Sequence, residues 1–352
     1  MAGRARAARL GRVFIAIRDL RFARGRFALL GGVVALMTLM VVALTGLTAG
    51  LRAAAVSAVD ALPTAYLAFQ QPADGEQVSF ATSALTADQV AALGAYPLGI
   101  STTRLAAGGR TVAVTAFGAD AALLPPLRGG APGGLVLPAD LAADLGLSPG
   151  DTVLLGGRPQ PVSALAAPLS FSHLPVVYLP VPAWRELART DAVTAAALAA
   201  PPAAPVPGTV LRTRAEARDA VGGFSSEQGS LDLMRGLLLV VSALVVGAFF
   251  TVWTVQRTPD LAVVRALGAG RSYLLRDAVG QAAAVLLAGA LVGGAAATGL
   301  GLLAARAVPY VADAATIAPP LLAMVGVGLL GAVVAVRRVA AVDPITALGG
   351  AR

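Results

Sequence analysis

A short cluster of mostly charged residues lies at the start of the second long apolar stretch of the chain. It consists of Glu227, Asp232, Met234 and Arg235. Charged side chains at the edge of an apolar segment are costly to keep there, and they often mark the path of a substrate. The competing interpretation is an anchor, in which Arg235 extends its guanidinium to the headgroups of a membrane. The cluster therefore indicates either substrate recognition or anchoring, and the residue types alone allow both.

Other residues with chemical potential lack the neighbours that catalysis or metal binding needs. His173 is the only histidine, and no nucleophile motif adjoins it, so we interpret it as a packed or surface residue. Asp140, Asp144 and Asp151 do not have the spacing of a calcium-binding loop, and we expect capping or solvated roles for them. Because the chain has no cysteine and one histidine, thiolate sites and histidine-cluster metal sites are excluded.

The basic residues exclude one way of using ATP. All 27 of them are arginine, whereas a phosphate-binding P-loop needs a lysine after its glycines to reach the terminal phosphates. Five glycines gather in the third apolar stretch, but small residues inside an apolar helix serve close helix packing. They are Gly289, Gly293, Gly294, Gly299 and Gly301. The sequence therefore predicts that the chain is not an enzyme, holds no cofactor and cannot hydrolyse ATP by itself.

Four apolar stretches indicate a membrane protein. The chain is 57% hydrophobic and 13% charged, with a mean hydropathy of +0.77, whereas globular domains are about 25% charged. A helix that crosses a bilayer needs about 20 mainly apolar residues. The stretches of sufficient length are residues 27–50, 231–256, 278–305 and 317–336.

The distribution of arginine predicts the orientation of these spans. Residues 1–26 carry eight arginines and one acid, whereas residues 51–230 carry ten arginines and thirteen acids. Because basic residues favour the cytoplasmic side, we expect residues 1–26, 257–277 and 337–352 to be cytoplasmic, and residues 51–230 and the 306–316 loop to be external. Apolar residues at helical spacing in the first segment predict an amphipathic helix at the inner headgroup layer. The prediction is a multi-pass protein of the cell membrane with both termini inside. Charge placed beside spans does not indicate nucleic-acid binding.

The segment between the first two spans has the composition of a folded domain. It contains 18 of the 23 prolines, and these punctuate short elements. Strands are predicted at 111–117, 135–137 and 152–155, with a helix at 138–145. We expect a loop over 192–207 and a helix over 212–221. The fold class is therefore an integral membrane α-helical protein with four transmembrane helices and an α+β extracytoplasmic domain inserted between helices 1 and 2.

Two short motifs, together with this layout, resemble the FtsX/MacB-type permeases of ABC transporters. Residues 259–270 read PDLAVVRALGAG, and residues 343–348 read DPITAL. The first resembles the segment through which the family contacts its ATPase, and the resemblance implies that role for Asp260, Leu261, Val264, Arg265, Leu267 and Gly268. It further implies a cytoplasmic ABC ATPase partner that binds ATP and Mg²⁺, a second copy of this chain in a homodimer, and contact with membrane lipid.

Within that family, residues 18–22 and 247–253 look like the haem-efflux branch, the HrtB permeases. This resemblance implies haem as the substrate, with Glu227 and Met234 as possible iron ligands, Arg235 as a partner for a propionate, and Met40 as a further candidate. Core packing is the competing role for Met37 and Met40. The alternatives are an exporter of lipids, peptides or hydrophobic drugs, an FtsX-like regulator of an extracellular hydrolase, and a membrane-anchored enzyme, against which the missing catalytic constellation counts.

Overall fold

The computed structural model describes residues 24–256, 270–305 and 307–340. The chain divides into two compact units. We call Met1–Gly50 together with Leu231–Arg352 the helical unit, and Leu51–Ser230 the inserted domain. The predicted amphipathic helix, the predicted ATPase-contact segment and the tail after residue 340 lie outside the described residues.

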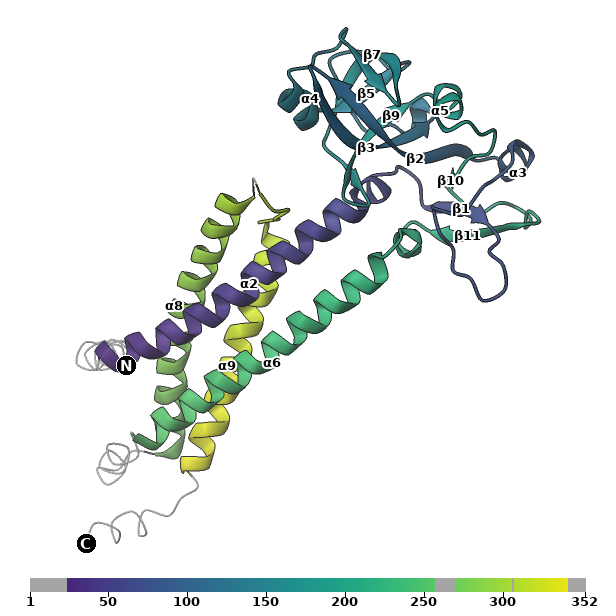
Figure 1. Cartoon of the computed structure of the whole chain (residues 1–352). Coiled ribbons are helices and arrows are strands. Elements are labelled where there is room, and N and C mark those ends of the chain that lie inside the picture. The colour runs from purple at the N-terminus through teal and green to yellow at the C-terminus, as the bar shows by residue number, and fades with distance from the viewer. Residues whose placement is uncertain (1–23, 257–269, 306, 341–352) are drawn as a thin grey trace, which may run out of the picture. The chain divides into compact units, whose positions relative to one another are not determined.

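Four long helices account for the apolar stretches (Figure 1). They are α2 (Arg24–Asp60), α6 (Phe224–Gln256), α8 (Arg271–Ala304) and α9 (Ala314–Ala340). Each contains a segment long and apolar enough to cross a membrane, so the prediction of four apolar helices is confirmed. All four are longer than the predicted apolar stretches. In particular, α2 continues to Asp60 and α6 begins at Phe224.

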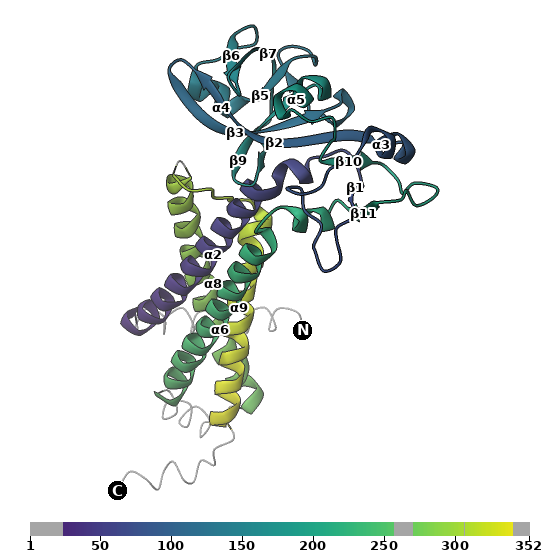
Figure 2. The ribbon, with the colours of Figure 1, turned by 45° about the vertical axis from the view of Figure 1, so that its right-hand side comes forward.

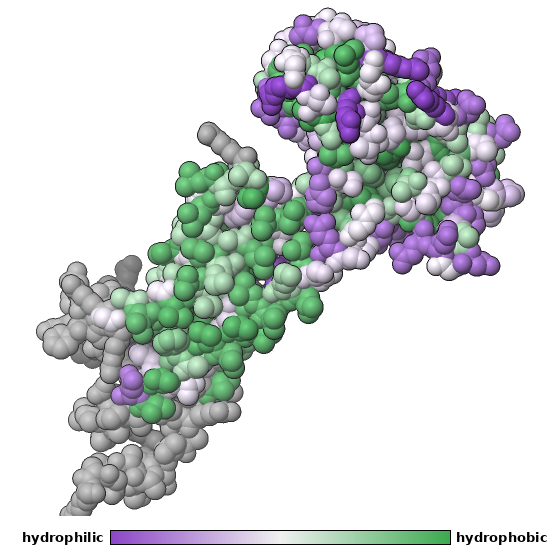
Figure 3. All heavy atoms as spheres, viewed as in Figure 1, coloured by the Kyte–Doolittle hydropathy of each residue, from purple (hydrophilic) through white to green (hydrophobic). Residues whose placement is uncertain are grey.

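Small residues let the helices of the helical unit approach closely. A β-carbon at Gly289 would lie 2.8 Å from the carbonyl oxygen of Gly31, and one at Gly293 would lie 2.9 Å from the α-carbon of Ala35. These positions on α8 therefore pack directly on the backbone of α2, as predicted from the spacing of small residues. Elsewhere the helices present apolar side chains outward, which cover them in green in Figure 3.

The inserted domain is built on one mixed sheet of eleven strands. Its order is β11-β1-β10-β2-β3-β9-β5-β7-β4, with β6 beside β2 and β7, and β8 beside β9. The long hairpin of β2 and β3 is visible in Figure 2. The strands are β1 (Tyr66–Gln70), β2 (Tyr96–Ala107), β3 (Arg110–Ala119), β4 (Leu127–Arg128), β5 (Leu135–Pro138), β6 (Thr152–Leu155), β7 (Arg158–Ala166), β8 (Ser170–Phe171), β9 (Leu174–Leu179), β10 (Ala195–Leu198) and β11 (Thr209–Thr213). The helices are α3 (Ala87–Leu93), α4 (Ala139–Leu145) and α5 (Val181–Ala188), with short 3₁₀ helices η1 (Ala121–Leu123) and η2 (Glu216–Ala220).

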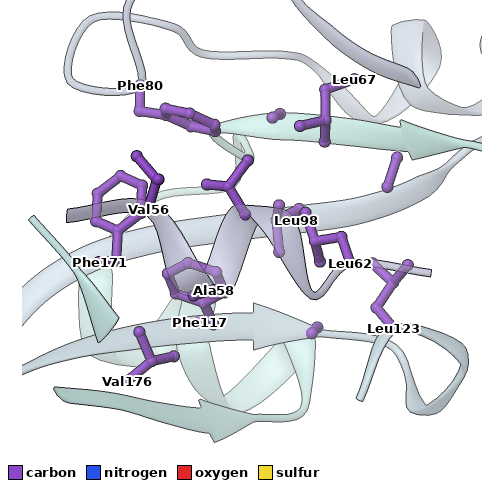
Figure 4. Close-up of a cluster of buried hydrophobic side chains, with 14 of the residues drawn as sticks. Val56, Ala58, Leu62, Leu67, Phe80, Leu98, Phe117, Leu123, Phe171 and Val176 are labelled. Carbon is purple, nitrogen blue, oxygen red and sulfur yellow. The ribbon is translucent and has the colours of Figure 1, made fainter. Parts of the chain in front are cut away.

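The end of α2 forms part of the core of the inserted domain. Val56, Val59 and Leu62 are at most 2% exposed and pack with strand residues such as Leu67 and Phe117. Figure 4 shows this helix among the aromatic rings of the cluster. Because burying one such side chain contributes about 1.5–3 kcal/mol, residues 51–62 are structural components of the domain and not a linker to it.

Two expectations for the inserted domain were wrong in part. The predicted loop 192–207 contains β10, whose four residues are buried between β1 and β2. A strand covered on both faces shows no alternation, so its alanines gave no strand signal. The predicted helix 212–221 is the end of β11 followed by η2. Pairing of Thr213 with Tyr66 keeps that segment extended.

Candidate functional site

Arg235 and Asp232 form an exposed ion pair on α6. Arg235 Nη2 lies 3.0 Å from Asp232 Oδ1, and the two side chains are 40% and 58% exposed. Such a pair contributes only about 0–1 kcal/mol, and a guanidinium carries five donors. Within the described part of the chain Asp232 is the acceptor that Arg235 binds, so its other donors can bind an acidic group.

Met40 and Met234 differ from the other described methionines in their surroundings. Met40 on α2 is 45% exposed and Met234 on α6 is 56% exposed. Met37 packs against the core of the helical unit, and Met324 is buried in it. Core packing is thus the role of Met37, as expected. The same expectation was wrong for Met40, because its side chain lies on an exposed face of α2.

Fully buried hydroxyls mark the packing of α2 with α6. Ser242 donates to the Leu238 carbonyl oxygen at 2.7 Å, and its oxygen lies 3.7 Å from the Met37 sulfur. Thr38 Oγ1 is buried, and it has no hydrogen-bond partner within the described part of the chain. Polar groups inside an apolar bundle are costly and characteristic of functional positions.

Tyr310 inserts between α2 and α8 from the segment that joins α8 to α9. A β-carbon at Gly46 would lie 2.5 Å from its ring, and one at Gly301 would overlap the same ring. The Tyr310 hydroxyl donates to the Ala297 carbonyl oxygen at 3.3 Å, and the Val311 amide donates to the Gly46 carbonyl oxygen at 3.1 Å. The predicted 306–316 loop is therefore packed between helices in its described part.

His173 contacts the predicted ligand Glu227 in the inserted domain. The distance between His173 Nε2 and Glu227 Oε2 is 3.2 Å, and the two side chains are 45% and 32% exposed. An ionised carboxylate only accepts, so the imidazole N–H donates. Sequence reasoning missed this role of His173, since 54 positions separate the two residues.

The turn that carries His173 has an unusual backbone. Ser172 and His173 both have positive φ, 50° and 64°, in the two-residue connection of β8 and β9. Two other hairpins of the domain have connections of the same length, and both use glycine pairs, Gly108–Gly109 and Gly156–Gly157. Positive φ at both central residues is the pattern of a type I′ turn, which favours glycine and asparagine. The absence of glycine from so short a connection is the sequence signal that could have singled out His173.

This turn is bound to α2 as well as to α6. The Ser172 and His173 amides donate to the carbonyl oxygens of Ala55 and Ala54 at 2.8 and 3.0 Å. Ser57 Oγ accepts from the Ser170 amide at 2.8 Å. Separately, Arg218 Nε donates to Asp60 Oδ1 at 2.6 Å and ties η2 to the end of α2. Within the inserted domain, hydrogen bonds therefore join the end of α2 and the start of α6 to the sheet and its connections.

The remaining predicted residues either cap local backbone amides or lie outside the described residues. Asp140 accepts from the Leu141 amide and Asp151 from the Ser148 amide, as capping groups do. Among the described residues, no group of three or more acidic or histidine side chains could hold a metal. The six predicted ATPase-contact residues, Asp260 to Gly268, belong to the segment that is not described.

Comparison with known proteins identifies the helical unit. The family model described as the FtsX-like permease C-terminal region matches residues 233–344. The chain carries an FtsX-like permease domain. This FtsX-like domain comprises α6 from Leu233 onward, α8 and α9, and the glycine packing and the Tyr310 insertion involve these helices.

Relatives place the FtsX-like domain within ABC transporters. An uncharacterized ABC transporter permease of Mycobacterium bovis is 28% identical over 352 residues, which cover 96% of this chain and 99% of that protein. A protein of Staphylococcus haemolyticus with the name hemin transport system permease protein HrtB is 29% identical over 132 residues, or 38% of each chain. The extracellular domain of the transporter YknZ from Gram-positive bacteria aligns with a TM-score of 0.30 at 14% identity, over 45% of this chain and 88% of that one. The family match and the four apolar helices support a multi-pass permease subunit of the ABC type, and that family implies a cytoplasmic ATPase partner.

Proposed function

We propose that this permease belongs to an efflux transporter that removes haem from the membrane, driven by ATP hydrolysed in a separate cytoplasmic subunit. The observation that carries the proposal is the exposure of Met40 and Met234 on α2 and α6. Thioether sulfur is an axial ligand of haem iron, and both sulfurs are on faces where a planar apolar molecule can reach them. The partial likeness to HrtB supports the same substrate.

The charges of the cluster suit the acidic groups of haem. A propionate at the membrane boundary needs a cationic partner, and the Arg235 donors that do not pair with Asp232 can bind it. Glu227 is a weaker iron ligand than its position in the sequence suggested, because its carboxylate is already bound by His173.

The remaining parts of the proposal come from the family resemblance and the arginine distribution. The permease acts as a homodimer, and the segment from Asp260 to Gly268 binds the ATPase, with ATP and Mg²⁺ held by that partner. Both termini are cytoplasmic and the inserted domain is external. Apolar faces of α2 and α6 that carry Leu36 and Leu244, which are 54% and 73% exposed, are available to lipid or to the second copy.

Absorption spectroscopy of the purified permease titrated with haem tests the substrate. We expect Met40→Leu and Met234→Leu to shift the haem spectrum and weaken binding about tenfold, the loss of roughly one ligand interaction of 1.4 kcal/mol. Met37→Leu and Met324→Leu are matched controls, because these side chains pack in the core, and their spectra should equal that of the wild type. Unchanged haem spectra in both Met40→Leu and Met234→Leu would show that neither thioether is a ligand of the haem iron.

The alternatives predict other outcomes of the same preparation. A wild-type permease that binds no haem, and whose complex hydrolyses ATP faster with lipid or peptide, would be an exporter of those molecules. A complex whose hydrolysis responds to none of them, but whose inserted domain binds a cell-wall hydrolase, would be an FtsX-like regulator.

A further inference from the structure

We propose that His173 is a positioning residue. Through the Ser172–His173 turn it fixes the position of the first turn of α6 relative to the end of α2. The structural part of this inference depends only on the inserted domain. Its consequence for transport rests on the proposed function, since coupling to ATP hydrolysis has meaning only in a permease complex.

The backbone of the turn is the first argument. A left-handed conformation is unfavourable for residues other than glycine and persists only where the surroundings determine it. Gly108–Gly109 and Gly156–Gly157 make the same kind of connection without this cost. A hairpin without other contacts would be more stable with glycine at 172 and 173. The side chain at 173, however, makes a contact with Glu227 that glycine cannot make.

The contacts of the turn supply the second argument. Its two amides bind Ala54 and Ala55 near the end of α2, which fixes the backbone of the turn against that helix. The His173 side chain then extends to Glu227 in the first turn of α6. One two-residue turn therefore bonds both helices, with its backbone to one and its side chain to the other.

Besides the packing of Phe224 in the domain core, the first turn of α6 has one further described side-chain hydrogen bond, and it is local. Ser225 Oγ donates to Asp219 Oδ1 at 3.0 Å, six positions away. That bond joins α6 only to η2, which precedes it directly. The bond from His173 is the described side-chain hydrogen bond between this turn and the β8–β9 hairpin. Because Phe224 stays buried in the core, loss of this bond should loosen the part of the turn that carries Glu227 while leaving Phe224 and the sheet in place.

Replacement of His173 by glycine separates this role from stability. His173→Gly removes the side-chain bond and relieves the positive φ, so the unfolding temperature should stay equal or rise by about 2–4 °C. The amides of residues 224–230 should nevertheless exchange with deuterium about threefold to fivefold faster, the effect of losing a half-exposed charged contact. Glu227→Ala should give the same exchange, and the double variant should add nothing.

Gly109→His is the matched control. It places the same residue type at a positive φ of 78° in the β2–β3 turn, where a β-carbon would meet no atom within 4 Å. The unfolding temperature should therefore fall, while exchange at 224–230 stays as in the wild type. Unchanged exchange at 224–230 in His173→Gly would overturn the positioning role.

Coupling is tested in the complex with the ATPase, using haem as the probe. Haem-stimulated hydrolysis should fall about threefold to fivefold in His173→Gly and stay unchanged in Gly109→His. The variant with the higher unfolding temperature should therefore be the one with the weaker stimulation. Faster exchange with full stimulation would overturn the transport role of His173. A wild-type complex that haem does not stimulate refutes the haem proposal, and the exchange result still decides the structural part.

Discussion

The contact between Gly293 and α2 predicts opposite effects for one substitution at two positions of the same helix. Alanine in place of glycine in a helix interior normally stabilises by about 0.5–1 kcal/mol, because the unfolded chain loses freedom. Gly299 meets no atom within 4 Å that an added methyl group would disturb, so Gly299→Ala should show that gain.

At Gly293 the same methyl group meets the backbone of Ala35. Its carbon would overlap the Ala35 carbonyl oxygen and lie 2.9 Å from the Ala35 α-carbon, against an ordinary contact of at least 3.4 Å. Backbone atoms cannot rotate away, so α2 and α8 must separate by half an ångström or more. Overpacking of this kind costs about 1–3 kcal/mol, and after subtraction of the helix gain of about 0.5–1 kcal/mol Gly293→Ala should destabilise by up to about 2.5 kcal/mol.

The measurement is the loss of helical circular dichroism as SDS is added to the permease in mild-detergent micelles. Gly293→Ala should move the midpoint to lower SDS and Gly299→Ala to higher SDS. Leucine at the two positions should widen the difference. If Gly293→Ala stabilises the protein as much as Gly299→Ala does, α2 does not pack on α8 at this glycine and the reasoning fails.

Three further predictions concern topology, coupling and acid sensitivity. Reporter fusions at Gly150 and Arg352 should report opposite sides of the membrane, because arginine flanks the spans on one side; the same side for both contradicts the orientation. Arg265→Glu should weaken assembly with the ATPase or uncouple hydrolysis from substrate, measured by copurification and turnover, and an unchanged complex with normal stimulation rejects this contact. Hydrogen bonds from the Thr213 backbone and hydroxyl lower the pKa of Glu216 below its ordinary 4.5. A carboxyl group with a lowered pKa stabilises the folded state above its ordinary pKa, and this stabilisation is lost as pH falls through the lowered pKa. Glu216→Gln should therefore reduce the fall of the unfolding temperature in acid. A pH profile identical to that of the wild type would contradict this role of Glu216.

The sequence predicted those parts of the fold that depend on local composition. Apolar length alone gives four helices, and strand β3 follows from its β-branched alternation at Thr111 to Phe117. Small residues within the third apolar stretch indicated close packing of α8, which Gly289 and Gly293 confirm and Gly299 does not. These signals are readable because each depends on residues that are neighbours along the chain.

The parts that were missed depend on residues far apart in the sequence. Strand β10 is alanine-rich and gains its conformation from β1 and β2 on either side. The contact of His173 with Glu227 exists only because the β8–β9 turn is bound to α2. Local composition does not predict such long-range contacts. A two-residue hairpin connection without glycine can, however, be recognised once the strands are known.

The place of β1 in the sheet has a consequence for biogenesis. This strand leaves the ribosome first, yet it pairs on one side with β10 and on the other with β11, the last two strands to be made. Until they arrive, both edges of Tyr66–Gln70 carry unpaired amides and carbonyls, a state prone to wrong pairing. Long-range pairing also forms slowly. The inserted domain therefore reaches a protected state only after its whole length has been synthesised, and a chain that stalls before Thr209 exposes an unfinished sheet to chaperones and proteases.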